Sequence, residues 1–198
     1  VLRLSSGECF TSRTSAALLF ASVYEKIPLS MRADVHSMFV SLCTDETPMV
    51  RRAAARDMSA LVKRMSPEVI INEMLPLYRR LSADDQDSVR LLTVQNLVAM
   101  AEVLSPAETQ QLLLSSICGA FQDKSWRVRY MAADNFVQLA TAVGEDVVKE
   151  DLVPAYINLM RDAEAEVRTA AATQLPGLAK LLDQNTIIER LLPVAKEL

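Results

Sequence analysis

The chain has 198 residues, of which 51% are hydrophobic and 23% are charged, so it can bury a sizeable core and is not disordered. Its 25 acidic and 21 basic residues give a net charge of −4, which argues against a nucleic-acid-binding protein because phosphate binding needs concentrated positive charge. The 4 glycines, the 9 methionines and the 5% of aromatic residues favour helices over sheets.

One histidine excludes a multi-histidine metal centre, and the odd number of cysteines, three, fits a reducing compartment. The longest apolar runs, such as 18–21, are far shorter than the roughly 20 residues that a membrane span needs. No signal peptide is visible at the N-terminus. Because the chain begins with Val1 and ends inside an expected helix, we expect it to be a segment of a longer protein.

An internal repeat with a period of 39 residues organises the chain. The signature D-x-x-x-x-V-R occurs four times at this interval. Its aspartates are Asp45, Asp84, Asp123 and Asp162, and its arginines are Arg51, Arg90, Arg129 and Arg168. Agreement in so many columns far exceeds chance, so each period should fold as one structural unit.

Residues 1–28 are predicted to hold the second helix of a partial repeat, in which Arg13 aligns with Arg52. The full repeats that follow are 29–66, 67–105, 106–144 and 145–183, and 184–198 forms the first helix of another. In each repeat, an apolar first helix precedes the signature, and a second helix of about 16 residues begins at it. Several first helices contain a proline that should bend them, namely Pro76, Pro154 and Pro193.

A hairpin of two such helices cannot bury both apolar stripes alone, so neighbouring hairpins must stack. A period near 40 residues is typical of HEAT repeats, whereas ankyrin and tetratricopeptide repeats have roughly 33 and 34. The sequence therefore predicts an all-α fold, a HEAT-repeat α-solenoid in which the hairpins form a right-handed superhelix. The whole chain, 1–198, would be one array.

Residues that are identical in every repeat should serve stacking, which every repeat has in common. We expect the signature aspartates to cap the amides at the start of the second helix. The signature arginines should reach laterally to a neighbouring turn and form a ladder of charges along one edge. A row of anion sites is the less favoured alternative, because each arginine has an acidic residue nearby.

Residues that differ between equivalent turns are the candidates for recognition of a partner. Trp126 lies on a turn between Ser125 and Arg127, and tryptophan and arginine dominate interface hot spots. The alternative is that its ring folds over the adjacent turn. Met49 beside Pro48 offers a smaller apolar contact, and Arg52 adds a second basic residue. The acidic turn Asp84–Asp87 either orients a basic partner or is a solvated surface.

Catalysis finds no support in the sequence. His36 has no equivalent in the other repeats, and no nucleophile motif, phosphate-binding glycine loop or paired metal-ligand spacing occurs. Cys9, Cys43 and Cys118 lie in three different repeats, as expected of small packing residues. We therefore expect a non-enzymatic protein without a metal or a cofactor.

Several turn sequences resemble the family of scaffolding A subunits of protein phosphatase type 2A. They are CTDETPMVRRAAA at 43–55, DQDSVRLL at 85–92 and DKSWRVRYM at 123–131. The resemblance covers essentially the whole chain and places it at about the fourth to eighth of fifteen HEAT repeats. Two positions depart from the family pattern: Cys9 stands where tryptophan is usual, and Pro176-Gly177 should interrupt the last complete second helix.

This resemblance implies a non-catalytic scaffold that binds regulatory (B-type) subunits through the turns within its repeats. The implied contacts are Glu46, Pro48, Arg52, Ser125, Trp126 and Arg127, with Asp84 and Asp85 as weaker candidates. The catalytic subunit would bind repeats outside this segment, and neither nucleic acid nor a membrane is an expected partner. The expected location is the cytoplasm, with the nucleus as an alternative. A HEAT-repeat adaptor or a nuclear-transport-type receptor is the rival function.

Overall fold

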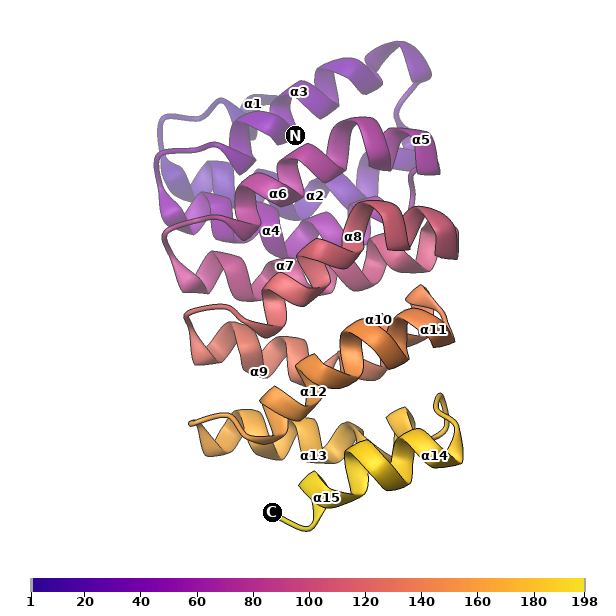
Figure 1. Cartoon of the computed structure of the whole chain (residues 1–198). Coiled ribbons are helices and arrows are strands. Elements are labelled where there is room, and N and C mark those ends of the chain that lie inside the picture. Colours follow the sequence, from indigo (N-terminus) through magenta and orange to yellow (C-terminus); the bar gives the residue numbers. More distant parts are fainter. Residues whose placement is uncertain (1, 198) are drawn as a thin grey trace. The chain divides into compact units, whose positions relative to one another are not determined.

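The structure, a computed structural model, describes residues 2–197. In this part of the chain 82% of the residues are helical and no strand occurs. The chain divides into two compact units, Val1–Val103 and Leu104–Leu198, and each is built of helical hairpins (Figure 1). Among the described residues, no helix is both long and apolar enough to cross a membrane.

The first unit has two layers of helices. Its α-helices are α1 (Leu2–Ser5), α2 (Phe10–Val23), α3 (Arg32–Cys43), α4 (Pro48–Val62), α5 (Pro67–Val69), α6 (Leu75–Ser82) and α7 (Asp87–Val103). Shorter turns are η1 (Tyr24–Lys26), η2 (Leu29–Met31) and η3 (Ile70–Met74). The second helices α2, α4 and α7 pack side by side in one layer, and the first helices α3 and α6 form the other (Figure 1).

The second unit repeats this plan. Its α-helices are α8 (Pro106–Phe121), α9 (Trp126–Asp134), α10 (Phe136–Val143), α11 (Glu145–Val147), α12 (Val153–Met160), α13 (Ala165–Ala179), α14 (Gln184–Thr186) and α15 (Leu192–Ala195). The turns η4 (Val148–Leu152) and η5 (Ile187–Leu191) precede α12 and α15. Helices α9 and α10 pack against α13, whereas α8, α12 and α15 form the first-helix layer.

The core of each unit lies between its two layers. In the first unit, the rings of Phe20 and Phe39 meet edge to face with centroids 5.3 Å apart. In the second unit, the ring of Phe136 lies 4.9 Å from that of Phe121 and 4.8 Å from that of Tyr156. All of these side chains are buried, so stacked hairpins do cover the apolar stripes that the repeat pattern predicts.

Each proline of a first helix lies just after a π-helical turn. The backbone N–H of Leu75 bonds to the carbonyl of Ile70, and Val153 and Leu192 bond to Val148 and Ile187 in the same way. A proline cannot donate a hydrogen bond, and its ring crowds the carbonyl four residues earlier, so the helix widens at this place. Where serine replaces the proline, in α3 and α8, the helix has no π-helical turn.

The second helix of the predicted repeat 106–144 is interrupted at Asn135, between α9 and α10. The side-chain amide of Asn135 donates a hydrogen bond of 2.7 Å to the carbonyl of Met131. Asn135 is only 6% exposed, so its amide must find a partner inside the protein, and the preceding turn supplies one. The repeat pattern alone does not predict this break.

The expected interruption at Pro176-Gly177 is wrong, because α13 runs without a break from Ala165 to Ala179. Gly177 has a packing role there. A Cβ atom built on it would lie 2.8 Å from Cγ2 of Val137 in α10. Glycine therefore allows α13 and α10 to approach each other more closely than any other residue would allow.

Replacing Gly177 with alanine should lower the free energy of unfolding by about 1 kcal/mol, because the clash with Val137 outweighs the better helix propensity of alanine. The double variant Gly177→Ala, Val137→Ala removes the clashing methyl groups. Thermal and urea unfolding of both variants would measure the effect. A single variant that is more stable than the parent protein would show that α10 and α13 separate without cost.

A buried histidine joins three elements of the first unit. Nε2 of His36 in α3 lies 3.0 Å from the hydroxyl of Tyr24 in η1, and Nδ1 contacts a carboxylate oxygen of Glu73 in η3. The rings of His36 and Tyr24 are stacked with centroids 5.6 Å apart, and the guanidinium of Arg32 lies 4.9 Å from the Tyr24 ring centroid. His36 thus links residues of three consecutive predicted repeats.

His36→Phe should lower the free energy of unfolding by about 1–3 kcal/mol, because it keeps the ring but leaves the buried Tyr24 hydroxyl without its partner. Adding Tyr24→Phe removes that hydroxyl and should recover part of the loss. Urea unfolding of the single and double variants measures both effects. If the double variant recovers nothing, the orphaned hydroxyl is not the cause.

Candidate partner-binding ridge

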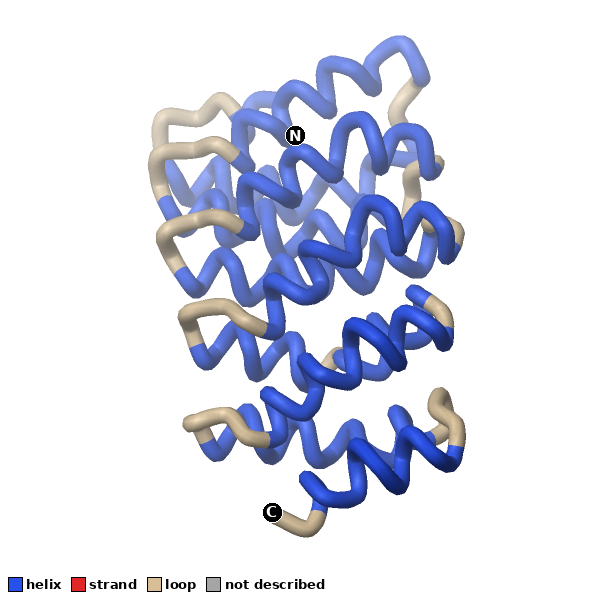
Figure 2. The backbone as a smooth tube through the Cα atoms, viewed as in Figure 1, coloured by secondary structure: helices blue, strands red, loops and turns tan. Residues whose placement is uncertain are grey.

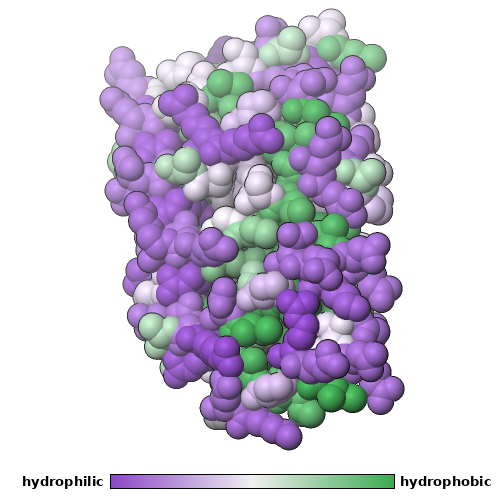
Figure 3. Space-filling view, viewed as in Figure 1, coloured by the Kyte–Doolittle hydropathy of each residue, from purple (hydrophilic) through white to green (hydrophobic). Residues whose placement is uncertain are grey.

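The turns that join the two helices of each repeat lie along one edge of each unit, and we call them the turn ridge (Figure 2). In the first unit they are 6–9, 44–47 and 83–86, and in the second unit they are 122–125 and 161–164. Hydrophilic residues prevail along this edge (Figure 3). Because the second helices pack side by side within each unit, neighbouring turns are also neighbours in space.

The signature aspartates stabilise the turns, but they do not cap the helical amides as the sequence predicts. Each carboxylate accepts a hydrogen bond from the N–H two residues further on, at a residue that still precedes the helix. The donors are Thr47 for Asp45 (2.8 Å), Gln86 for Asp84 (3.0 Å), Ser125 for Asp123 (2.8 Å) and Glu164 for Asp162 (3.0 Å). The aspartates therefore set the entry of the chain into the helix.

The signature arginines connect neighbouring turns within a unit. Nε and Nη2 of Arg51 bind the two carboxylate oxygens of Asp84 at 2.6 and 3.1 Å, and Arg129 binds Asp162 at 2.6 and 2.9 Å. Nη1 of Arg51 also donates to the carbonyls of Asp45 and Glu46 in its own turn. Such bidentate pairs are geometrically specific, so each fixes the relative position of two turns.

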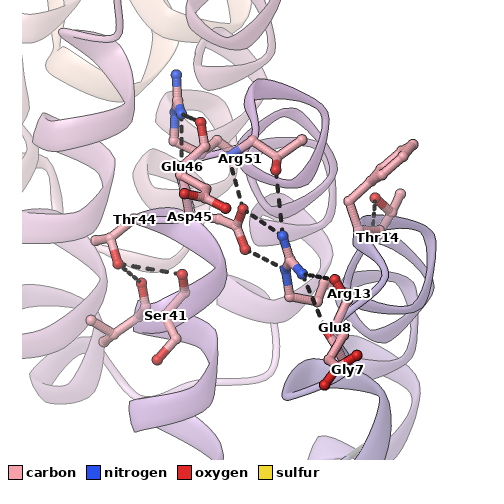
Figure 4. A network of polar contacts seen from close by, with 12 residues as sticks. Gly7, Glu8, Arg13, Thr14, Ser41, Thr44, Asp45, Glu46 and Arg51 are labelled. Carbon is pink, nitrogen blue, oxygen red and sulfur yellow. Dashed lines mark hydrogen bonds and ion pairs between the residues drawn. The ribbon is translucent and has the colours of Figure 1, made fainter.

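Arg13 forms the same contacts, which the sequence alignment of the repeats missed. It binds Asp45 through Nε at 2.6 Å and through Nη2 at 3.2 Å, and its Nη1 donates to the carbonyls of Gly7 and Glu8 (Figure 4). Arg13 is thus equivalent to Arg51, and its alignment with Arg52 is wrong by one residue. The buried pairs Ala16-Ala17 and Ala54-Ala55, 38 residues apart, are the signal that reveals this shorter interval.

Arg90 and Arg168 bind their own turns in the same manner. Nη1 of Arg90 donates to the carbonyls of Asp84 and Asp85 at 2.8 and 3.1 Å. Nη1 of Arg168 donates to the carbonyls of Asp162 and Ala163 at 2.7 and 3.0 Å. All five turns of the ridge are therefore braced from inside by an arginine.

These contacts shift the pKa values of the aspartates. Burial of the Asp84 carboxyl opposes its ionisation, but the hydrogen bonds from Arg51 and from the Gln86 N–H outweigh burial and hold its pKa below the usual range. The same balance, with Arg13 and Thr47, lowers the pKa of Asp45. At Asp162 the hydrogen bonds from Arg129 are the largest influence, and they lower its pKa. The ionised aspartates are thus part of the folded structure.

A hollow of about 340 Å³ lies between the second and third turns of the first unit. The charged residues that line it are Asp45, Glu46, Arg51, Arg80, Asp84 and Asp85. Arg51 and Asp84 are paired with each other, and Asp45 is paired with Arg13. The carboxylates of Glu46 and Asp85 at the rim therefore face a hollow in which Arg80 is the remaining cation among the lining residues.

The structure brings the first group of candidate contacts to the surface of one turn. Glu46, Pro48, Met49 and Arg52 are all exposed, and Met49 is 51% exposed. Asp85 on the next turn is also exposed, whereas Asp84 is half-buried in its pair with Arg51. These residues therefore offer apolar, basic and acidic groups at a single place on the ridge.

Trp126 begins α9 and is half-buried, so it is not part of the core. The guanidinium carbon of the exposed Arg127 lies 5.1 Å from the centroid of its ring. Ser125 precedes the helix, and its N–H is bound by Asp123. The ring and the guanidinium thus form a cation–π pair on a braced turn, and such a pair can pack as one unit against another protein.

Sequence reasoning missed two functional candidates on the first turn. Phe10, the first residue of α2, is 45% exposed and is the structural equivalent of Pro48 and Trp126, because each begins a second helix. Glu8 stands two residues before α2, as Glu46 stands two residues before α4, and is likewise exposed. The one-residue shift of Arg13 concealed both correspondences.

The chemistry of the ridge is that of a binding surface. No group of three or more histidine, cysteine, aspartate or glutamate residues that could hold a metal ion occurs in the described part of the chain. The buried His36 contacts Tyr24 and Glu73 away from the ridge turns. What the ridge does offer is rigid turns with exposed aromatic, apolar and charged side chains, the composition of protein–protein hot spots.

Comparisons with known proteins agree with this description. The HEAT repeat model matches residues 113–143, and the model described as PPP2R1A-like HEAT repeat matches residues 145–198. A designed armadillo repeat protein has a similar fold, with a TM-score of 0.61 and 17% identity over 100% of this chain and 90% of that one. The protein is therefore a HEAT-repeat solenoid protein.

Relatives in sequence narrow the class. The chain is 46% identical over 68 residues to the serine/threonine-protein phosphatase PP2A 65 kDa regulatory subunit of Drosophila melanogaster, covering 34% of this chain and 12% of that protein. It is 41% identical over 75 residues to the protein phosphatase 2A scaffold subunit of Dictyostelium discoideum, covering 38% and 13%. The chain fits a segment of the scaffolding subunit of protein phosphatase 2A, and the matched part spans only about an eighth of those relatives.

Proposed function

We propose that this chain is part of a non-catalytic scaffold of a protein phosphatase 2A holoenzyme and that its turn ridge binds regulatory (B-type) subunits. One observation carries the proposal: arginine–aspartate pairs brace the same turns that expose Pro48, Met49, Trp126 and Arg127. A surface that is already ordered binds with a smaller entropic cost, which is what a scaffold requires.

The named relatives support the scaffold role, since they are described as regulatory or scaffold subunits of a phosphatase. The ridge supplies the binding surface, and the packed helices behind it set the distance between turns. The catalytic subunit would bind through repeats outside this segment. We place the complex in the cytoplasm, with the nucleus as a second location.

Affinity capture tests this proposal. The longer protein that contains this chain, carrying a tag, is expected to recover a phosphatase catalytic chain together with a B-type regulatory subunit from cell extract. The isolated chain should bind a purified B-type subunit in a calorimetric titration but should not retain the catalytic chain. Recovery of a small GTPase or of basic cargo proteins in place of phosphatase subunits would favour the nuclear-transport-type receptor instead.

A further inference from the structure

Three successive turns of the first unit carry a carboxylate at the same structural position, two residues before the second helix. These residues are Glu8, Glu46 and Asp85, and all three are exposed. None of the three carboxylates accepts a hydrogen bond or forms an ion pair within the described residues. In the second unit the same position holds Lys124 and Ala163, so the acidic row is a property of the first unit.

The backbone at this position is fixed. The carbonyl of each acidic residue accepts a hydrogen bond from Nη1 of the arginine that braces its turn. The distances are 3.0 Å for Arg13 to Glu8, 3.0 Å for Arg51 to Glu46 and 3.1 Å for Arg90 to Asp85. Because helices α2, α4 and α7 pack side by side, the three positions follow one another at the spacing of packed helices, about 10 Å.

This spacing excludes a shared metal ion, since carboxylate oxygens must approach a calcium ion to about 2.3–2.6 Å. The sign of the charge excludes a phosphate backbone. Exposed apolar side chains accompany the row, with Phe10 two residues after Glu8 and Met49 three residues after Glu46. Apolar groups between regularly spaced charges fit a protein segment that carries the opposite charge.

The geometry points to an extended, basic segment of a partner protein as the ligand of this row. In an extended chain, residues three apart lie about 10 Å from each other, so lysine or arginine at every third position would match Glu8, Glu46 and Asp85. The middle basic side chain would enter the hollow between the second and third turns, beside Glu46 and Asp85. This inference rests on the proposed function, because the regulatory subunit would supply the segment.

Two synthetic peptides test the spacing directly. Both contain three arginines with leucine and serine; in one the arginines occupy every third position, and in the other they are adjacent. Fluorescence anisotropy at low salt should show that the chain binds the spaced peptide about tenfold more tightly, as expected when three exposed charge pairs form together. Equal affinity for the two peptides would overturn the inference.

Charge reversal identifies the row. The variant Glu8→Lys, Glu46→Lys, Asp85→Lys should reduce the affinity for the spaced peptide about tenfold. A matched control, Glu145→Lys, Glu164→Lys, Glu166→Lys, makes the same change in net charge at exposed positions of the second unit and should leave affinity nearly unchanged. Circular dichroism checks that both variants stay helical. Equal loss in the two variants would show attraction by net charge alone and would overturn the inference.

A B-type subunit separates this inference from the proposed function. If the subunit does not bind the unmodified chain, the proposed function is overturned. If it binds the unmodified chain and the Glu8→Lys, Glu46→Lys, Asp85→Lys variant equally well, the function stands and the inference about the acidic row is overturned. Loss of binding in that variant alone supports both.

Discussion

Replacing Trp126 with alanine is expected to weaken binding of a B-type regulatory subunit about 30-fold, because truncated hot-spot tryptophans typically cost about 2 kcal/mol or more. The ring is half-buried and stands beside the Arg127 guanidinium on a turn that Asp123 and Arg129 brace. The loss should therefore come from the missing contact with the partner, since the turn keeps its own hydrogen bonds. Calorimetric titration of the variant against the parent chain measures it.

Two controls accompany this variant. Trp126→Phe keeps an aromatic face for Arg127 and should lose less affinity than Trp126→Ala. Arg127→Glu reverses the exposed charge and should also weaken binding while the helical circular dichroism signal stays the same. Unchanged affinity in both Trp126→Ala and Arg127→Glu would remove this turn from the interface.

Asp84→Ala is expected to lower the free energy of unfolding by about 2–3 kcal/mol, the range for hydrogen bonds to a charged group. The substitution removes both bonds from Arg51 and the bond from the Gln86 N–H. Its half-buried partner Arg51 then keeps only the turn carbonyls. Urea unfolding followed by circular dichroism measures the loss.

Asp84→Asn is the matched control. Asparagine can still accept the Gln86 N–H through its carbonyl oxygen, but it has no charge for Arg51. If the charge pair matters most, the asparagine variant should lose nearly as much stability as the alanine variant. If Asp84→Asn is as stable as the parent protein, the turn bond and not the pair with Arg51 holds the two turns together.

The lowered pKa values of Asp45, Asp84 and Asp162 also predict a pH dependence of stability. A carboxyl whose pKa is lower in the folded state contributes stability above its unfolded value, about 3.9. That contribution is lost as the pH falls through the folded pKa. The parent chain should therefore lose more stability than Asp84→Asn between about pH 5 and acid pH, in urea titrations at several pH values. Parallel losses would contradict the role of the Asp84 charge.

The repeat pattern alone was sufficient to predict helical hairpins and the lateral direction of Arg51 and Arg129. Both follow from local rules: apolar residues at three- and four-residue steps, and one arginine per period at a helix start. It also placed Trp126 on a turn. The pattern could not show that the first interval is one residue shorter, because a fixed period was assumed and Arg13 has two plausible counterparts.

The sequence by itself thus determined the fold class, the turns and the residue types displayed on them, since these depend on spacing along the chain. Only the tertiary structure decided the contacts that depend on neighbouring helices: the bond of Asp45 with Arg13, the close approach of Gly177 to Val137, and the acidic row of Glu8, Glu46 and Asp85. Their partners are more than 30 residues apart in the chain, and packing of the helices alone brings them together.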